Sequence, residues 1–409
     1  MSEHRGPATL FRGISELHTV SAAGVIQDGA VLAEEGLIRW VGAAADAPAA
    51  DEVIDLGGRA VLPGWVDSHT HMIFDGDRSA EFEARLAGED YAAGGIAVTM
   101  NATREAGEER LTQLLLERIA EAQAGGTTTI ETKTGYGLDV PSEELAARIA
   151  AQHVDDVTFL GAHLVPPDTD PEEYVDLVCG PMLDAVEPHV RWIDVFCERG
   201  AFTEEQSRRV LAAGKDRGLR GRVHGNQLGP GPGVRVAVEL GAASVDHVNY
   251  VTDEDVAALA ASDTVATVLP ACDLSTRQEL APARRLLDAG VTVAIATNLN
   301  PGTSYTTSMN FCVGTAVLQM RLSLAEAIQA ATTSGAKALE RHDVGEGRDP
   351  HGRPAKGTIV PGAAADLHVL RSAHAIDLAY RPGVPMTYRT YQAGHCIYDA
   401  TPAYQRSAQ

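Results

Sequence analysis

The sequence predicts an α/β protein, a (β/α)8 TIM barrel joined to a smaller β domain. Strand-like and helix-like segments alternate through the middle of the 409-residue chain, which indicates a parallel sheet. Eight such strands span roughly 280 residues, close to the about 250 that are typical of a TIM barrel. Short strand-like segments with tight turns lie towards both ends of the chain, which indicates the additional β domain.

The eight predicted barrel strands are short segments, most of them largely apolar, and most are followed by polar residues. They are residues 61–66, 127–131, 157–160, 192–196, 220–223, 243–245, 265–269 and 291–296. Helical patterns occupy residues 108–124, 143–153, 204–217 and 324–339. A doubly wound open sheet is the alternative. It is disfavoured by the absence of a Gly-rich dinucleotide fingerprint and by the paired histidines that follow the first strand.

The terminal segments are short strands separated by Gly, Asp and Pro. The predicted strands at the amino end are 17–20, 25–27, 30–33, 37–41 and 53–56, and those at the carboxyl end are 357–362 and 365–370, with strand-like pieces up to residue 398. We expect these segments to form a small β unit that carries no chemistry.

Composition excludes several classes of partner. The formal net charge of −23 argues against nucleic acid and anionic membranes, because both require a basic surface. The chain has five cysteines, none in a Cys-x-x-Cys pair, which favours reduced thiols in a cytosol. No run approaches the about 18 apolar residues that a membrane span requires. We therefore expect a cytoplasmic protein without nucleic-acid or membrane partners, and we expect a homodimer.

The most informative stretch is residues 61–71, where an apolar run leads through Pro63-Gly64 to His69-Thr70-His71. Side chains two residues apart on an extended strand point to the same side. Both imidazoles can therefore aim at one point, and neutral imidazole is a common metal ligand. A His-x-His pair alone is as readily structural, so ligands from other strand ends are needed to support a metal site.

Chemistry in a TIM barrel lies at the carboxyl ends of the strands, where this chain places several histidines. The histidines at the predicted strand ends are His69, His71, His163, His224 and His247. We expect His69, His71 and His224 to bind a metal, because three nitrogens leave an open position for water. His163 and His247 are better suited to the substrate or to supporting contacts.

The lysine content favours a single metal. Some binuclear metal sites in TIM barrels bridge the two metals with a carboxylated lysine on a mid-barrel strand. The fourth predicted strand of this chain has no lysine. The lysines of the chain are Lys133, Lys215, Lys337 and Lys356. We therefore expect one divalent metal, Zn²⁺ or Fe²⁺, because both suit imidazole ligands.

Together these motifs resemble the amidohydrolase superfamily and, within it, the imidazolonepropionase family, whose members open the imidazolone propanoate ring to N-formimidoyl-L-glutamate in histidine degradation. The motifs are His-Thr-His followed by Gly-Asp-Arg, Lys-x-Gly-Tyr-Gly-Leu, Phe-Leu-Gly-Ala-His, Asp-Val-Phe-Cys-Glu and Asn-Pro-Gly. The resemblance implies a composite β-sandwich from residues 1–63 plus 343–409 and a barrel from residues 64–342.

The resemblance also implies roles for individual residues. The substrate-binding positions of the family match Arg78, Tyr136, His163, Asn300 and Gly302. The catalytic positions match His247, Gln227 and Asn298. An arginine can grip the substrate's propionate bidentately, and histidines can stabilise an oxyanion or transfer a proton.

Two positions depart from the family pattern. Many members have an acidic residue where this chain has Gln227. The last strand of the family carries a metal-binding aspartate that handles the proton, and this chain has Asn298 there. An asparagine offers its carbonyl oxygen to a metal but cannot accept a proton.

Asn298 leaves three hypotheses open. The first is a hydrolase acting on imidazolone propanoate. The second is a related amidohydrolase that opens, or closes, a different five-membered cyclic amide. The third is a homologue that binds metal and ligand without catalysis. An absorbance assay of imidazolone propanoate consumption discriminates among them.

Overall fold

The computed structural model describes residues 6–87 and 95–401. The chain divides into two compact units, one comprising Met1–Asp67, Ala120–Thr129 and Ser308–Gln409 and the other Ser68–Ile119 and Ile130–Thr307. The domain boundaries predicted from the resemblance stay a prediction. Among the described residues, no helix is long and apolar enough to cross a membrane.

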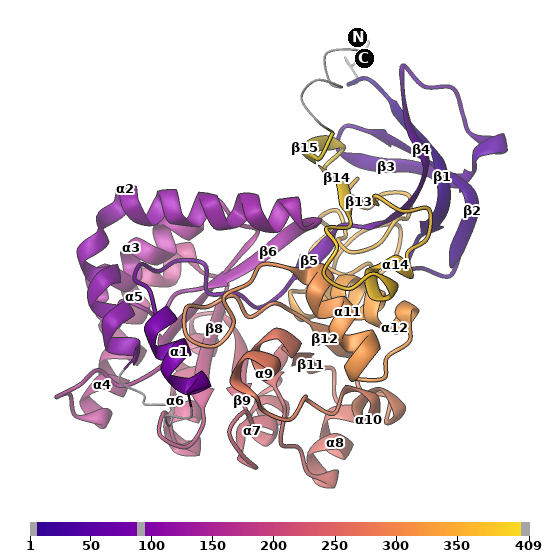
Figure 1. Cartoon of the computed structure of the whole chain (residues 1–409). Coiled ribbons are helices and arrows are strands. Elements are labelled where there is room, and N and C mark those ends of the chain that lie inside the picture. The colour runs from indigo at the N-terminus through magenta and orange to yellow at the C-terminus, as the bar shows by residue number, and fades with distance from the viewer. Residues whose placement is uncertain (1–5, 88–94, 402–409) are drawn as a thin grey trace. The chain divides into compact units, whose positions relative to one another are not determined.

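An eight-stranded sheet forms the barrel (Figure 1). Its strands follow one another in chain order and the described pairs are parallel, as the alternating pattern predicts. They are β5 (Trp65–Asp67), β6 (Thr127–Lys133), β7 (Asp156–Ala162), β8 (Trp192–Cys197), β9 (Arg220–Gly225), β10 (Ser244–His247), β11 (Val265–Val268) and β12 (Val293–Ile295).

Backbone hydrogen bonds link the segments that follow the first and last barrel strands. The amide of His71 donates to Leu299 O at 2.7 Å, and the amide of Asn298 donates to His69 O at 2.9 Å. The sheet is therefore nearly closed, and its closure brings the paired histidines beside the last loop.

Helices separate most of these strands, and several begin with a side-chain cap. At α6, for example, Thr203 and Gln206 form a reciprocal capping box. The α-helices of the second unit are α1 (Ser79–Leu86), α3 (Val140–Ala150), α4 (Pro171–Leu177), α5 (Leu183–Val186), α6 (Glu204–Asp216), α7 (Gly233–Leu240), α8 (Asp253–Ala260), α9 (Pro270–Thr276) and α10 (Ala283–Asp288). Two short η segments, η2 (Val178–Met182) and η3 (Glu187–His189), flank α5.

The remaining helices are α2 and those after the last barrel strand. They are α2 (Gly95–Ala124), α11 (Met309–Gln319), α12 (Leu324–Gln329), α13 (Gly335–Ala338) and α14 (Asp377–Tyr380). The helix predicted over 324–339 is interrupted by a π-helical turn, η4 (Ala330–Ser334). It is therefore two helices around a wider turn rather than one.

The predicted strand at residues 61–66 is two strands that belong to different sheets. The break lies at Gly64, where an added Cβ would come within 2.1 Å of Thr128 Oγ1. Residues up to Pro63 belong to β4, whereas β5 starts at Trp65 and begins the barrel. A residue without a side chain is needed at this close approach.

A seven-stranded sheet combines both ends of the described chain in the order β15-β14-β13-β4-β1-β2-β3. Its strands are β1 (Thr9–His18), β2 (Val25–Glu34), β3 (Leu37–Ala43), β4 (Glu52–Pro63), β13 (Leu367–Leu370), β14 (Thr387–Gln392) and β15 (His395–Asp399), and η1 (Ala44–Asp46) follows β3. The antiparallel pairing of β4 with β13 confirms that the two terminal regions build one sheet. The predicted strand at 357–362 is irregular backbone instead.

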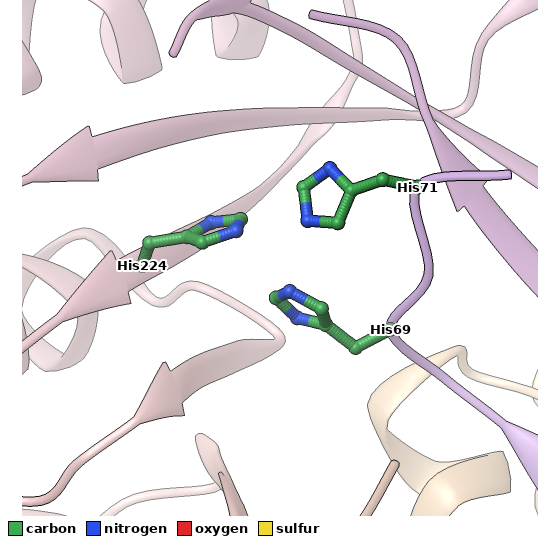
Figure 2. A group of neighbouring side chains, drawn as sticks. All are labelled: His69, His71 and His224. Atoms are coloured by element: carbon green, nitrogen blue, oxygen red, sulfur yellow. The ribbon is translucent and has the colours of Figure 1, made fainter. Parts of the chain in front are cut away.

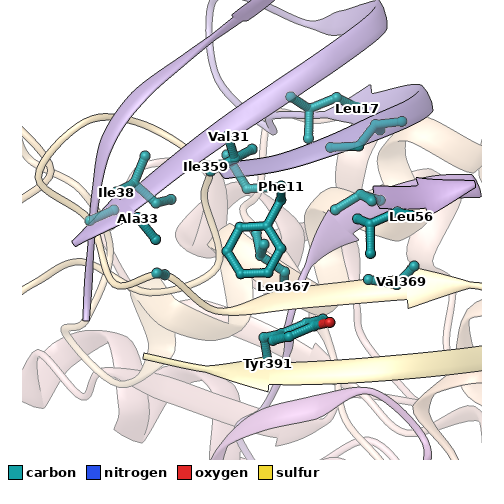
Figure 3. Packing of buried hydrophobic residues seen from close by; sticks show 14 of the residues in the cluster. Phe11, Leu17, Val31, Ala33, Ile38, Leu56, Ile359, Leu367, Val369 and Tyr391 are labelled. Carbon is teal, nitrogen blue, oxygen red and sulfur yellow. The ribbon is translucent and has the colours of Figure 1, made fainter. Parts of the chain in front are cut away.

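The core of this sheet is apolar (Figure 3). Phe11 packs edge-on against Tyr391, with 4.8 Å between ring centroids. Leu17, Val31 and Leu367 are fully buried in the same cluster. This unit therefore gains its stability mainly from apolar burial.

Candidate metal centre and active site

Three histidines converge in the barrel (Figure 2). His69 and His71 follow β5, and His224 lies in β9. One ring nitrogen from each histidine can be chosen so that the three nitrogens all lie within 4.8 Å of one another. All three side chains are buried. The structure thus brings together the three residues that the sequence analysis selects as metal ligands.

Thr70, which lies between His69 and His71, is fixed against β6 by two hydrogen bonds to Glu131. Its amide donates to Glu131 Oε2 at 3.2 Å and its hydroxyl donates to Glu131 O at 2.6 Å. His69 and His71 flank Thr70 just beyond the end of β5, and a ring nitrogen of each lies within 4.8 Å of one of the other and of His224. The His-x-His spacing therefore acts as predicted.

Carboxylates fix the tautomers of two of these imidazoles. His69 Nδ1 donates to Asp246 Oδ2 at 2.7 Å, and His224 Nδ1 lies 3.1 Å from the Asp194 carboxylate. A ligating histidine usually donates its other nitrogen in this way, which leaves Nε2 for the metal. Burial lowers the pKa of His69 and of His71 well below the ordinary value, so both rings are neutral, as ligation requires.

The polar atoms at this point fit a divalent cation. His69 Nε2 and His224 Nε2 are buried and have no hydrogen-bond partner among the described residues. Asn298 Oδ1 is likewise buried and unpartnered there, and the Asn298 backbone amide donates to His69 O at 2.9 Å. Leaving such atoms unpartnered is costly, and a metal ion removes that cost. The site is therefore suited to one divalent metal bound by imidazole nitrogen.

The structure contains a buried charged network beneath the histidines that the sequence did not predict. Lys133 Nζ lies 2.9 Å from Glu131 Oε1 and 3.1 Å from Asp194 Oδ2. Arg222 Nη2 lies 3.2 Å from Asp246 Oδ2 and donates to Ser68 O at 2.7 Å. These charged residues lie on four different strands, so only the alternation of inward-facing positions could have suggested them.

The charges of this network support one another. Burial by itself would raise the pKa of Asp194, but His224 and Lys133 lower it well below its usual range. Burial likewise opposes ionisation of Asp246, and Arg222 outweighs it, so that its pKa is lowered. Both carboxylates therefore stay ionised and can accept hydrogen bonds from the ligating imidazoles.

The predicted substrate residues on the first three strands also approach the histidines. Tyr136 and His163 lie with 5.3 Å between ring centroids, and the His163 ring stacks on His71 at 5.7 Å. His163 Nδ1 donates to Gly135 O at 2.8 Å, and burial lowers the pKa of His163 to about 4. The ring is therefore neutral at pH 7.

Arg78 lies at the start of α1 and is mostly buried. Its Nε and Nη2 donate to the two oxygens of Glu81 at 2.8 and 2.7 Å. Gly302 approaches the same guanidinium so closely that an added Cβ would lie 2.6 Å from Nη1. The predicted substrate-binding residues Arg78 and Gly302 are thus neighbours, and a side chain at position 302 would displace the guanidinium.

The predicted catalytic residue His247 lies beside two of the metal ligands. Its ring centroid is 5.9 Å from that of His69 and 5.5 Å from that of His224. Burial, followed by the charge of His224, lowers the pKa of His247 to about 3, and its Nδ1 has no hydrogen-bond partner among the residues described. A neutral ring with an accessible lone pair can accept a proton.

The loops after β9 and β12 hold the other predicted catalytic and substrate-binding residues. The backbone amide of Gln227 donates to Glu198 Oε2 at 2.9 Å, which fixes the loop after β9. In the loop after β12, the side-chain amide of Asn300 donates from Nδ2 to Asn298 O at 2.7 Å. Its Oδ1 accepts from the backbone amide of Gly302 at 2.9 Å. Asn300 therefore shapes the last loop around Asn298. The individual roles of all these residues stay predictions.

Comparisons with known proteins identify the family. The model described as "Amidohydrolase family" matches residues 204–389. The chain is 60% identical to an imidazolonepropionase of Paenarthrobacter aurescens (strain TC1) over 96% of this chain and 99% of that protein. It is 52% identical to an imidazolonepropionase of Mycolicibacterium smegmatis, with 92% of each protein covered.

Solved structures with little sequence similarity share the fold. A zinc-bound adenosine deaminase from Xanthomonas campestris aligns with a TM-score of 0.70 at 20% identity, over 98% of this chain and 96% of that one. An atrazine chlorohydrolase mutant from Arthrobacter aurescens TC1, complexed with zinc and atraton, aligns with a TM-score of 0.72 at 19% identity over 98% of both chains. The barrel, the three-histidine site and the near full-length relatives agree, and the chain belongs to the imidazolonepropionase family of the amidohydrolases.

Proposed function

We propose that this chain hydrolyses the ring amide of 4-imidazolone-5-propanoate to N-formimidoyl-L-glutamate, a step of histidine degradation. The observation that carries the proposal is the convergence of three buried imidazoles in a chain 60% identical to an imidazolonepropionase. Such a site binds a Lewis-acidic metal and has room for water beside it.

We propose one Zn²⁺ or Fe²⁺ ion held by His69, His71 and His224, with Asn298 Oδ1 as a further ligand. All four residues end in buried atoms that lack a protein partner in the described structure. A bound divalent metal polarises a carbonyl and lowers the pKa of water from about 15.7 to about 7. Either metal accepts imidazole and amide ligands.

Substrate anchoring is assigned to Arg78, Tyr136, His163 and the last loop. Arg78 supplies a positive charge that can bind the propionate, while Glu81 accepts from its Nε and Nη2 and Gly302 lies against its Nη1. His163 offers Nε2 to the ligand, because its Nδ1 is bonded to Gly135 O. Asn300 keeps Gly302 and Asn298 in place.

Proton transfer is assigned to His247, with Gln227 and Asn298 orienting the reactants. Water attacks the ring carbonyl carbon, a C–O bond forms and the ring C–N bond breaks. His247 Nδ1 accepts the proton that the water loses and returns it to the leaving ring nitrogen. The lowered pKa of His247 means that its ring is neutral at pH 7 before it accepts this proton.

Turnover of imidazolone propanoate by the metal-loaded protein, followed by absorbance, tests this proposal. We expect substrate consumption by the native chain. We also expect Asn298→Asp to raise kcat at least about tenfold with little change in KM, because a positioned acid–base group is typically worth about 10²–10⁴ in rate. If both forms bind the substrate but leave it intact, the proposed reaction is wrong.

We further propose a cytoplasmic homodimer that acts on this small carboxylate-bearing substrate, without nucleic-acid or membrane partners. The net charge of −23 supports the exclusion of polyanionic partners. Light scattering of the purified protein measures the oligomeric state, and a monomer at micromolar concentration contradicts the dimer.

A further inference from the structure

The three histidines differ in what supports them from behind. His69 and His224 each contact a buried carboxylate, whereas the aromatic neighbours of His71 include Tyr136 and His163. Behind each of the two carboxylates lies a buried cation. The two lines are Arg222–Asp246–His69 and Lys133–Asp194–His224.

Every charged member of these lines is fully enclosed. Lys133, Arg222, Asp194, Asp246 and the additional partner Glu131 are all 0% exposed. Burying a charge is costly unless it is paired and hydrogen-bonded, and an apolar replacement of such a pair is often as stable. Five charges at this depth are therefore better explained by the site above them than by folding stability.

Lys133 also ties the ligands to one another. Its ammonium bridges Glu131, whose other oxygen accepts from the Thr70 amide between His69 and His71, and Asp194, which holds His224. The hydroxyl of Thr158 donates to the Glu131 carboxylate. The strand that carries two ligands and the strand that carries the third are thus joined through one buried cation.

We propose that Lys133 is a positioning residue that sets the metal affinity of the site by holding Asp194, and through it His224, in the ligating orientation. This inference rests on the proposed metal site and deepens it. Lys133 acts on the ligands through Asp194, which contacts His224, and through Glu131, which accepts from the Thr70 amide between His69 and His71.

Charge and positioning predict opposite effects of removing Lys133. A buried cation close to the site repels a metal ion, so a purely electrostatic role means that Lys133→Met binds the metal more tightly. A positioning role means weaker binding, and loss of such outer contacts typically costs about 10–100-fold in metal affinity. The sign of the change therefore decides between them.

The test is the zinc dissociation constant of the full-length protein, measured with Zn²⁺ alone against a competing chelator. We expect Lys133→Met to raise it about 10–100-fold. The double variant Glu131→Gln/Lys133→Met removes one positive and one negative charge, so the net charge of the cluster is conserved. We expect the same loss in the double variant, and a changed visible absorption spectrum when Co²⁺ replaces Zn²⁺.

The matched control is Lys356→Met. Lys356 Nζ lies 2.7 Å from Asp366 Oδ2, and this pair of the other compact unit is also buried. We expect lower stability and an unchanged zinc dissociation constant. If Lys133→Met binds zinc as tightly as the parent or more tightly, or if the double variant binds like the parent, Lys133 does not act by positioning.

The parent protein separates this inference from the proposed function. If the parent retains no zinc or leaves imidazolone propanoate intact, the proposed function fails. If the parent binds zinc and turns the substrate over while Lys133→Met keeps the parental affinity, only the inference about Lys133 fails.

Discussion

Two interiors of this molecule are equally buried but chemically opposite. Beneath the three histidines, the barrel interior contains Lys133, Arg222, Asp194 and Asp246, all 0% exposed. The core of the seven-stranded sheet contains Phe11, Leu17, Ile38 and their apolar neighbours. Buried ion pairs of the first kind stabilise a fold poorly for their volume, and here two of the carboxylates contact His69 and His224, whereas apolar burial of the second kind stabilises the fold.

The comparison separates two properties that mutations usually change together. A change beneath the site is expected to alter metal affinity more than folding, and a change in the sheet core is expected to do the reverse. The predictions below test this separation.

The largest effect is expected at a ligand. His69→Ala leaves two imidazoles, a poor site, and we expect metal affinity to fall by at least about 10²-fold and turnover to be lost. Elemental analysis of the purified variant measures the metal content. The control His153→Ala changes an exposed histidine outside the site and is expected to keep one equivalent. One retained equivalent in His69→Ala contradicts the ligand assignment.

Removal of a large apolar side chain from the sheet core is the opposite test. Phe11→Ala is expected to lower the free energy of unfolding by about 3–5 kcal/mol, because it deletes a fully buried ring and its contact with Tyr391. Denaturant unfolding measures the loss, and Phe11→Leu is expected to lose less. Metal content of the folded variant should equal that of the parent. If Phe11→Ala has a reduced metal content but the stability of the parent, the two interiors do not have the separate roles described above.

Loss of the substrate anchor is expected to have an intermediate effect. Arg78→Ala removes the charged fork, and hydrogen bonds to a charged group are worth about 1.5–3 kcal/mol. KM for imidazolone propanoate should therefore rise about 10–100-fold at unchanged metal content. Arg110→Ala, which removes an exposed ion pair with Asp75, serves as the control. An unchanged KM in Arg78→Ala refutes the anchor.

The remaining effect develops only at acid pH and concerns the stability of the sheet unit. Burial lowers the pKa of His368 to about 3, from an ordinary value near 6.5, and its Nε2 pairs with Thr387 Oγ1 at 2.9 Å. The unfolded chain therefore binds this proton first as the pH falls. Stability from this residue is complete above about pH 6.5 and declines by about 1.4 kcal/mol per pH unit down to about pH 3.

Replacement of His368 isolates that slope. His368→Gln keeps a polar group near Thr387 but removes the titration. We expect the dependence of unfolding free energy on pH between about 6 and 4 to decrease by about one proton in the variant. Equal slopes in the two proteins mean that His368 contributes nothing to acid unfolding.

Much of the barrel was predictable from the sequence because each strand carries its own pattern. The apolar segments and the His-x-His pair locate the strands and two ligands without knowledge of distant contacts. The break at Gly64 was not predictable, because it depends on the close approach of Thr128. The π-helical turn at Ala330–Ser334 also interrupts a pattern that looks continuous in sequence.

The charged support of the site could not be predicted for a related reason. Lys133 and Asp194 are far apart in sequence, and each alone is an ordinary polar residue at a strand. Their roles arise only when barrel closure places them 3.1 Å apart beneath His224. A lysine that could bridge two metals is recognisable from its strand, whereas the pairing of Lys133 with Asp194 is not.

The most direct test of the account is product formation by one preparation before and after metal removal. A chelator-treated sample should form no N-formimidoyl-L-glutamate from imidazolone propanoate, and one equivalent of Zn²⁺ or Fe²⁺ per chain should restore its formation. Undiminished product from the metal-free protein, or none from the reloaded protein, would contradict a hydrolase built on His69, His71 and His224.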